Sequence, residues 1–277
     1  MQLPFKDVTQ MAVKCGHVAL VTHSGVCHAD DACCSALLTL YFEQLGVQIH
    51  QIRTRNEDDL QTIKDMPAVV YDVFNGELDH HQDTPVLDGG RTLSSIGKLW
   101  RYGKEEFIET FNLNATTWKY IDQHLFFAVD ETDNSSKTDP FSFVLNCVRG
   151  CKGAEDPDGE DWQRTLDQTK YLLKCVLESN AILSANMAKF DELPYITISG
   201  KRFKLNETGH YIPPVSKTYN AKFAGYIFKS ADHYEISCNK IIPNNKLKDS
   251  DNPDILFIHP QKWFATAKTL DALKTLV

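Results

Sequence analysis

Histidine and aspartate side chains gather where an apolar strand gives way to a helix near the start of the chain. Residues 17–22 are apolar and β-branched enough to predict a buried strand, and residues 32–45 form an apolar segment typical of a helix. Four side chains stand at this junction: His23, His28, Asp30 and Asp31. In open α/β sheets, ligands bind outside the carboxyl ends of the strands. The competing interpretation is that the carboxylates cap the helix and the histidines are core residues.

Three later segments carry the same residue types. Residues 68–73 form a second buried-strand pattern with Asp72 near its end, and an apolar run over 125–129 leads to a third group of carboxylates. These segments contribute Asp72, then Asp79, His80 and His81, then Asp130 and Asp133. Imidazole with carboxylate, and no cysteine in the ligand positions, favours Mn²⁺ or Mg²⁺ over structural zinc. Several aspartates supply enough charge for two ions, an arrangement that hydrolyses phosphate esters.

The motifs THSGVCHADDA, VVYDV, DHHQ and VDETDN occur in the order found in the DHH phosphoesterase superfamily, which this sequence resembles. That superfamily includes RecJ-type exonucleases, oligoribonucleases, cyclic-dinucleotide phosphodiesterases and manganese pyrophosphatases. Within it, the sequence is most similar to the melanocyte-proliferating-gene (Myg) branch, whose members look like metal-dependent exonucleases. Further support comes from IRTR at 52–55, LSSIG at 93–97, and His259 with Trp263-Phe264 and Lys268-Thr269. The resemblance covers most of residues 15–135 and about the last twenty-five.

The resemblance implies roles for these residues. Two metal ions, Mn²⁺ or Mg²⁺, are expected to be surrounded by His23, His28, Asp30 and Asp72, with Asp72 bridging. His80 and either Asp130 or Asp133 would complete the second ion, and the sequence leaves both carboxylates open. Asp79 and His81 are expected to orient the ligands or contact substrate, so that Asp72, Asp79, His80 and His81 form the catalytic set. The expected phosphate-binding side chains are Arg53, Arg55, Ser94, Ser95, His259 and Lys262. For Ser94 and Ser95, a plain helix N-cap is the alternative.

The sequence departs from the family pattern at three places. Asp31 stands where the branch usually has Glu, and Phe74-Asn75 replaces a glycine pair. In the C-terminal signature, Lys262 and Ala265-Thr266 stand where glycines are expected. None of these positions is an expected metal ligand. The last group bears on substrate binding, because glycines there would let the backbone approach a phosphate closely.

Composition narrows the class of protein. A hydrophobic fraction of 42% over 277 residues is ordinary for a globular protein, and no apolar run approaches the roughly 20 residues of a membrane span. The start of the sequence has no signal-peptide pattern. Eight scattered cysteines predict free thiols in a reducing compartment, and hence a cytoplasmic location. The net charge of −8 argues against a long footprint on duplex nucleic acid.

Strands that alternate with helices predict an α/β protein with a parallel sheet. We expect a DHH-like catalytic domain at 1–190, which ends in a long amphipathic helix over 162–190, and a smaller α/β or α+β substrate-binding domain at 191–277. The acidic segment 151–161 fits a solvated loop better than a calcium site. The long helix connects the domains, with a homodimer seam as the alternative.

The leading hypothesis is a metal-dependent 3'-5' exonuclease or oligonucleotide phosphodiesterase that acts on short single-stranded RNA, with two ions activating water. A second hypothesis is a hydrolase of a small phosphate compound, either pyrophosphate or a cyclic dinucleotide. A third is a non-catalytic module that binds metal or nucleotide; loss of a ligand would favour it, yet every expected ligand position is occupied.

Overall fold

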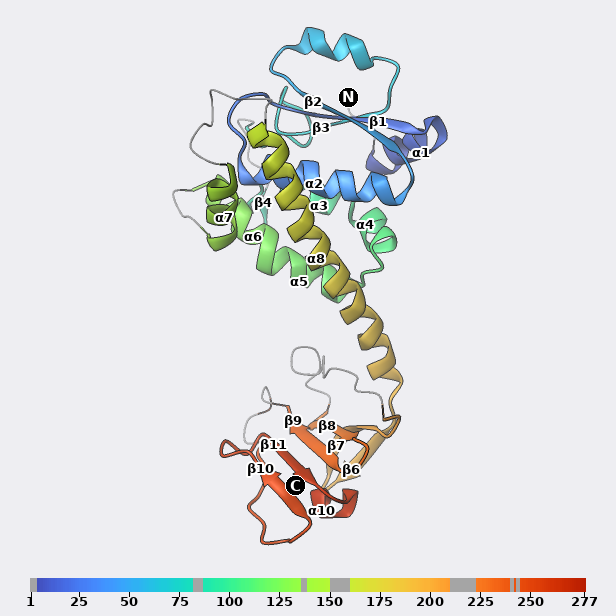
Figure 1. Cartoon of the computed structure of the whole chain (residues 1–277), viewed down its shortest axis with the longest axis vertical. Helices are drawn as coiled ribbons and strands as arrows, with labels where there is room; N and C mark the ends of the chain where they lie inside the picture. The colour runs from blue at the N-terminus through green and yellow to red at the C-terminus, as the bar shows by residue number, and fades with distance from the viewer. Residues whose placement is uncertain are drawn as a thin grey trace. The chain divides into compact units, whose positions relative to one another are not determined.

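Figure 1 shows the computed structural model, which describes residues 4–81, 87–135, 139–149, 160–209, 223–239, 242 and 245–277. The chain divides into two compact units, Met1–Ala181 and Ile182–Val277. The long helix α8 (Glu160–Glu192) contributes to both, so the division lies within it, nine residues before the boundary expected after residue 190. Gln82 of the DHHQ motif and residues 151–159 of the acidic segment lie outside the described residues.

The first unit is built on a three-stranded parallel sheet in the order β2-β1-β3. Its strands are β1 (His17–Thr22), β2 (Gln48–Arg53) and β3 (Ala68–Val70). Val21 in the central strand pairs with Ile52 on one side and Val70 on the other. The predicted parallel sheet and mixed α/β class are confirmed.

Strand β1 is buried on both faces because its alternate side chains enter two apolar clusters. Val18 and Leu20 pack in the cluster that contains helix α2 (Ala29–Gln44), while Ala19 and Val21 pack with Ile63 of the 3₁₀ helix η1 (Glu57–Ile63). Helix α2 is itself buried on nearly every side, as its apolar composition requires. The first turn of α2 is therefore held firmly at the end of the central strand.

Strand β3 ends earlier than the apolar pattern over 68–73 predicts. Tyr71 forms only an isolated bridge with Leu78, and Asp72, Phe74 and Asn75 have positive φ values of 56°, 63° and 51°. A left-handed backbone cannot continue a strand, so the chain turns at Asp72.

Helices form the rest of the first unit. Helix α1 (Phe5–Cys15) lies at the start of the chain, and a two-stranded hairpin of β4 (Leu87–Asp88) and β5 (Arg91–Thr92) follows the sheet. The helices after this hairpin are α3 (Ser95–Tyr102), α4 (Lys104–Thr110), α5 (Ala115–Ile121), the π-helical turn η2 (Asp122–Phe126), α6 (Phe127–Asp133) and α7 (Pro140–Arg149). Their core centres on Trp100, which stacks on Phe107 and Trp118. Most of residues 104–133 are helical.

The second unit contains the end of α8 and a six-stranded sheet in the order β10-β11-β9-β8-β7-β6, followed by helix α10 (Leu270–Lys274). Its strands are β6 (Tyr195–Ile198), β7 (Lys201–Asn206), β8 (Gly225–Lys229), β9 (Tyr234–Cys238), β10 (Ile255–Ile258) and β11 (Phe264–Ala267). Each neighbouring pair is antiparallel except β7 and β8.

Two further observations concern the described part of the chain. None of its helices is long and apolar enough to cross a membrane. Six of its cysteines are free thiols: Cys15, Cys27, Cys33, Cys34, Cys175 and Cys238.

Candidate metal centre

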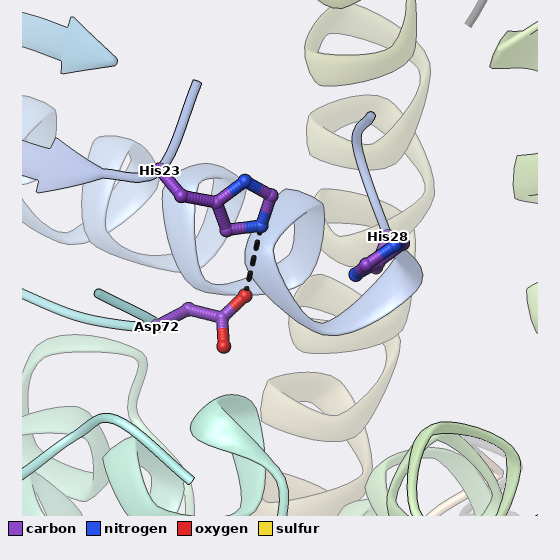
Figure 2. Close-up of side chains that lie close together, drawn as sticks. All are labelled: His23, His28 and Asp72. Atoms are coloured by element: carbon purple, nitrogen blue, oxygen red, sulfur yellow. Dashed lines mark ion pairs between the residues drawn. The ribbon is translucent and has the colours of Figure 1, made fainter. Parts of the chain in front are cut away.

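A histidine at the end of β1 faces an aspartate that follows β3. Figure 2 shows the His23 ring directed at the Asp72 carboxylate, with His28 at the start of α2 nearby; His23 Nε2 lies 3.2 Å from Asp72 Oδ2. His23 Nδ1 lies 3.1 Å from the carbonyl oxygen of Ser24, an acceptor for a proton on Nδ1. With Nδ1 held in this way, removal of the Nε2 proton would leave a lone pair directed at the Asp72 carboxylate, the orientation that a metal ligand needs.

A second histidine approaches the same carboxylate from the 79–81 loop. His80 Nε2 lies 3.2 Å from Asp72 Oδ1, 3.6 Å from Asp30 Oδ2 and 3.1 Å from Asp133 Oδ2. The two oxygens of Asp72 thus face different imidazoles. Segments far apart in the sequence, namely the β1–α2 junction, the loop after β3 and the end of α6, meet at this one carboxylate.

Three sets of side chains place their potential ligand atoms within 4.8 Å of one another. The sets are His23 with His28 and Asp72; Asp72 with His80 and His81; and His28 with Asp30 and Asp133. Asp72 and His28 each belong to two sets. Shared ligands are the arrangement expected for adjacent ion positions.

Five buried polar atoms in this cluster make no hydrogen bond of acceptable geometry within the part of the chain that the structure describes. They are Asp30 Oδ1, Asp31 Oδ2, Asp72 Oδ2, His80 Nε2 and Asp133 Oδ2. Buried polar atoms are almost always paired, since an unpaired one costs about 1–3 kcal/mol. Oxygen and imidazole nitrogen atoms facing one another are the donor set of Mn²⁺ or Mg²⁺, so these residues fit such an ion.

The electrostatics of the cluster also favour a cation. Burial and the neighbouring charges of Asp72 and Asp133 raise the pKa of Asp30, and burial raises the pKa of Asp31 to about 6. Asp72 is the exception: hydrogen bonds from His23 and His80 outweigh its burial and lower its pKa. Burial opposes charge on the two histidines, but hydrogen bonding to Asp72 prevails and raises the pKa of each.

The structure separates the two carboxylates between which the sequence could not choose. Asp130 accepts hydrogen bonds from Ser94 N (2.9 Å) and Ser94 Oγ (2.6 Å) and pairs with Arg91 Nε at 2.9 Å. It also lies against Gly97, where a Cβ would come within 2.3 Å of its Oδ1. Asp133, one helical turn further along α6, instead faces His80.

The two serines at the start of α3 hold carboxylates. Ser94 is the N-cap residue, but its side chain makes no capping hydrogen bond, because its hydroxyl donates to Asp130. Ser95 Oγ donates to Asp72 Oδ1 at 3.0 Å. Both serines are fully buried, so in this arrangement their hydroxyls orient carboxylates.

The arginines after β2 brace the turn that follows β1. Arg53 Nη2 donates to the Gly25 carbonyl at 3.0 Å, and its guanidinium lies 4.1 Å from the centre of the Trp162 ring. Arg55 Nε donates to the Ser24 carbonyl at 3.0 Å. Arg55 is exposed beside His23, which leaves part of its guanidinium accessible from solvent.

The remaining predicted site residues divide between the two units. In the first, Asp79 Oδ1 accepts from both the backbone N and Nδ1 of His81, and His81 is half-exposed. In the second, His259 Nδ1 accepts from Gln261 N, and Lys262 pairs with Asp249 at 2.5 Å. The contacts of His259 and Lys262 lie within the second unit.

Asp31 was grouped with the junction residues, with a helix cap as the alternative, and was not assigned as a metal ligand, yet it lies within this cluster. Its Oδ1 accepts from His28 N at 2.8 Å, and its Oδ2 lies 3.5 Å from His23 Nε2. The signal available in the sequence was its place beside Asp30 in the first turn of a buried helix. The helix-cap interpretation is confirmed for Asp31, because the backbone N of His28, from which it accepts, is that of the N-cap residue of α2.

Two of the departures from the family pattern coincide with left-handed backbone. Phe74 and Asn75, which replace a glycine pair, have positive φ, and so does Lys262, at 58°. Glycine adopts such angles freely, whereas other residues do so at a cost. These turns therefore have the left-handed backbone that glycine favours, but they are formed by residues for which that conformation is strained.

Residues 19–145 match the family model MYG1_exonuc, described as "Uncharacterised protein family (UPF0160)". The predicted resemblance to the Myg branch is thereby confirmed for this segment. Among solved structures, the chain is similar to exonuclease RecJ bound to manganese, at 12% identity and a TM-score of 0.30, over 99% of this chain and 92% of that one. It is also similar to RecJ from Thermus thermophilus with Mg²⁺ (14%, 0.29) and with Mn²⁺ (12%, 0.29). Those two matches cover 99% of this chain but 51% and 53% of the Thermus chains, so it spans about half of their length. No curated protein matches the chain.

Proposed function

Starting from the match of residues 19–145 to a family model named for an exonuclease, we propose that this protein is a metal-dependent phosphodiester hydrolase. Its substrate is short single-stranded RNA, degraded from the 3' end as an exonuclease or oligonucleotide phosphodiesterase. The proposal includes two Mn²⁺ or Mg²⁺ ions as cofactors and a cytoplasmic location.

One observation carries this proposal. Buried oxygen and nitrogen atoms from three segments of the chain converge at Asp72, and both oxygens of Asp72 face an imidazole. Two imidazoles cannot neutralise the four carboxylates of Asp30, Asp31, Asp72 and Asp133, so the cluster keeps an excess of negative charge. In the metal-free site each imidazole shares a proton with Asp72, and divalent cations would take the place of those protons between the same ligand atoms.

Specific residues would hold the ions. We assign His23, His28, Asp30, Asp72, His80 and Asp133 as ligands, with Asp72 shared. Divalent ions bound there would supply an activated water and neutralise charge on the phosphate. Asp133 is preferred to Asp130 because Asp133 faces His80, whereas Asp130 is held by Ser94 and Arg91.

The other residues of the site position these ligands or meet the substrate. Ser95 fixes Asp72, and Ser94 fixes Asp130 on the neighbouring helix. His81, oriented by Asp79 and half-exposed, is placed to contact the reacting phosphodiester. Arg55 is the first candidate for a phosphate contact in this unit, while Arg53 braces the Gly25 turn. His259 and Lys262 of the second unit are proposed to grip phosphates further along the chain of a longer substrate.

The test is hydrolysis by the metal-stripped protein after addition of Mn²⁺. Four substrates should be compared: a 5'-labelled RNA pentamer, the same DNA sequence, pyrophosphate and a cyclic dinucleotide. We expect the RNA to shorten stepwise while the label stays on the residual oligomer, with Mn²⁺ at least as effective as Mg²⁺ because imidazole ligands suit the softer ion.

Each alternative has its own signature in this experiment. Preferred hydrolysis of pyrophosphate or the cyclic dinucleotide would make the protein a small-phosphate hydrolase. Metal binding without hydrolysis of any substrate would make it a binding module. Full activity after exhaustive chelation would contradict a metal-dependent mechanism.

A further inference from the structure

The first half of helix α3 presents polar side chains to several segments of the metal centre. Ser94 donates to Asp130 of α6 and Ser95 donates to Asp72 after β3. The third such residue is Lys98, which sequence analysis did not select. It lies four residues after Ser94 and three after Ser95, so the three side chains share one face of the helix.

Lys98 is a buried lysine with a specific acceptor. Its side chain is only 7% exposed, and Nζ donates to the main-chain carbonyl oxygen of Asp79 at 2.6 Å. Lysine is almost never buried without a partner that offsets its desolvation. Burial lowers the pKa of Lys98, although the charges of Asp79, Asp72 and Glu77 oppose this.

The acceptor belongs to the peptide group that joins Asp79 to His80. The Asp79 side chain ties the same loop together, since Oδ2 accepts from Asn75 N at 2.8 Å and Oδ1 accepts from His81 N at 3.0 Å. The 79–81 loop is closed by local hydrogen bonds, and Lys98 anchors this loop to α3. The residue next to the anchored carbonyl is His80, whose Nε2 faces three carboxylates.

We propose that Lys98 is a positioning residue that fixes the 79–81 loop, so that His80 Nε2 is held at ligand distance from the ion it shares with Asp72 and Asp133. This inference rests on the proposed metal centre but assigns it a component that the family match does not provide. Partners that orient metal ligands typically change metal affinity 10- to 100-fold when they are removed.

Charge alone predicts the opposite effect. Lys98 carries a positive charge close to a cluster of carboxylates, and removal of that charge would strengthen the attraction for a divalent cation. Positioning predicts a weaker metal site after substitution, whereas a mere electrostatic neighbour predicts a stronger one. The sign of the change therefore separates the two.

The experiment is calorimetric titration of the metal-free full-length protein with Mn²⁺, in wild type and in Lys98→Met, which keeps most of the side-chain volume but loses donor and charge. Lys119→Met is the matched control, because Lys119 is an exposed lysine on the neighbouring helix α5. Thermal melts in chelator report whether each variant folds. If Lys98→Met does not fold, Lys98→Gln replaces it, since it lacks the charge but retains a donor one bond shorter.

We expect at least one Mn²⁺ site to weaken 10- to 100-fold in Lys98→Met, with a smaller loss in Lys98→Gln and no change in Lys119→Met. Unchanged or tighter binding in a folded Lys98 variant would overturn the positioning role while leaving the proposed function intact. Failure of the wild type to bind Mn²⁺ would overturn both. Normal Mn²⁺ binding without hydrolysis in the wild type would contradict the proposed function alone.

Discussion

Asp133 Oδ2 lies 3.1 Å from His80 Nε2, although His80 follows β3 and Asp133 ends α6. Neither atom makes a hydrogen bond of acceptable geometry within the described part of the chain. Both belong to the cluster around Asp72, so this contact closes one side of the candidate metal centre. Its counterpart, Asp130, instead accepts a hydrogen bond from Ser94 and forms an ion pair with Arg91.

The two carboxylates of α6 should therefore respond differently to amide substitution. We expect Asp133→Asn to weaken Mn²⁺ binding by at least tenfold without lowering the melting temperature of the metal-free protein. Asp130→Asn should instead lower that melting temperature, because Arg91 loses one carboxylate partner, a charged hydrogen bond worth about 1.5–3 kcal/mol, and keeps Asp122. Titration calorimetry and thermal melts in chelator measure the two effects. Reversed effects would mean that Asp130 is the ligand.

Substitution of the shared carboxylate should abolish turnover. Asp72→Asn nearly keeps the shape of the side chain but removes the charge between His23 and His80, so we expect no detectable phosphodiester hydrolysis. The Asp72→Asn variant should still fold, which circular dichroism in chelator would show. Near-normal hydrolysis by the variant would contradict the assignment of Asp72.

Several of these features were accessible from the sequence. The strand before His23, the buried helix after Asp31 and the parallel sheet all follow from local apolar patterns, which reflect burial directly. The choice between Asp130 and Asp133 was not accessible. Both lie on one face of α6, one turn apart, and a π-helical turn that no pattern indicated precedes this helix.

The start of α3 shows a second limit. A serine pair before an apolar run is the usual sign of an N-cap, and Ser94 does occupy that position. Its hydroxyl nevertheless bonds to Asp130, thirty-six residues away. Long-range partners of this kind depend on the assembled fold, which local sequence does not encode.

Left-handed backbone at Lys262 gives a prediction for the second unit. Lys262→Gly and Lys262→Ala both remove the ion pair with Asp249, but only glycine adopts a φ of 58° without strain. We expect the glycine variant to be more stable than the alanine variant by roughly 1 kcal/mol. Native-state hydrogen exchange of the β11 amides would measure this locally. Equal protection in the two variants would show that the angle carries no cost.

Metal-free stability should depend on pH through the buried carboxylates. The pKa of Asp31 rises from 3.8 to about 6 on folding, so between these pH values the folded protein keeps a proton that the unfolded chain has lost. The unfolding free energy therefore falls as pH rises through this window, by at most roughly 3 kcal/mol for this residue. The raised pKa values of His23 and His80 act in the same direction at higher pH. Urea unfolding in chelator at pH 4.5 and 7.5 should show a smaller difference in Asp31→Asn than in wild type. If the unfolding free energy changes equally with pH in Asp31→Asn and in wild type, the proton retained on folding is bound by another group.

The central claim is that the cluster around Asp72 holds divalent ions. Crystals grown with Mn²⁺ and measured at the manganese absorption edge test it directly, because anomalous scattering locates the metal without reference to activity. The account predicts two anomalous peaks about 3.5–4 Å apart, on either side of the Asp72 carboxylate, one beside His23 and the other beside His80 and Asp133. Data from crystals containing Mn²⁺ with no peak within bonding distance of Asp72 would contradict it.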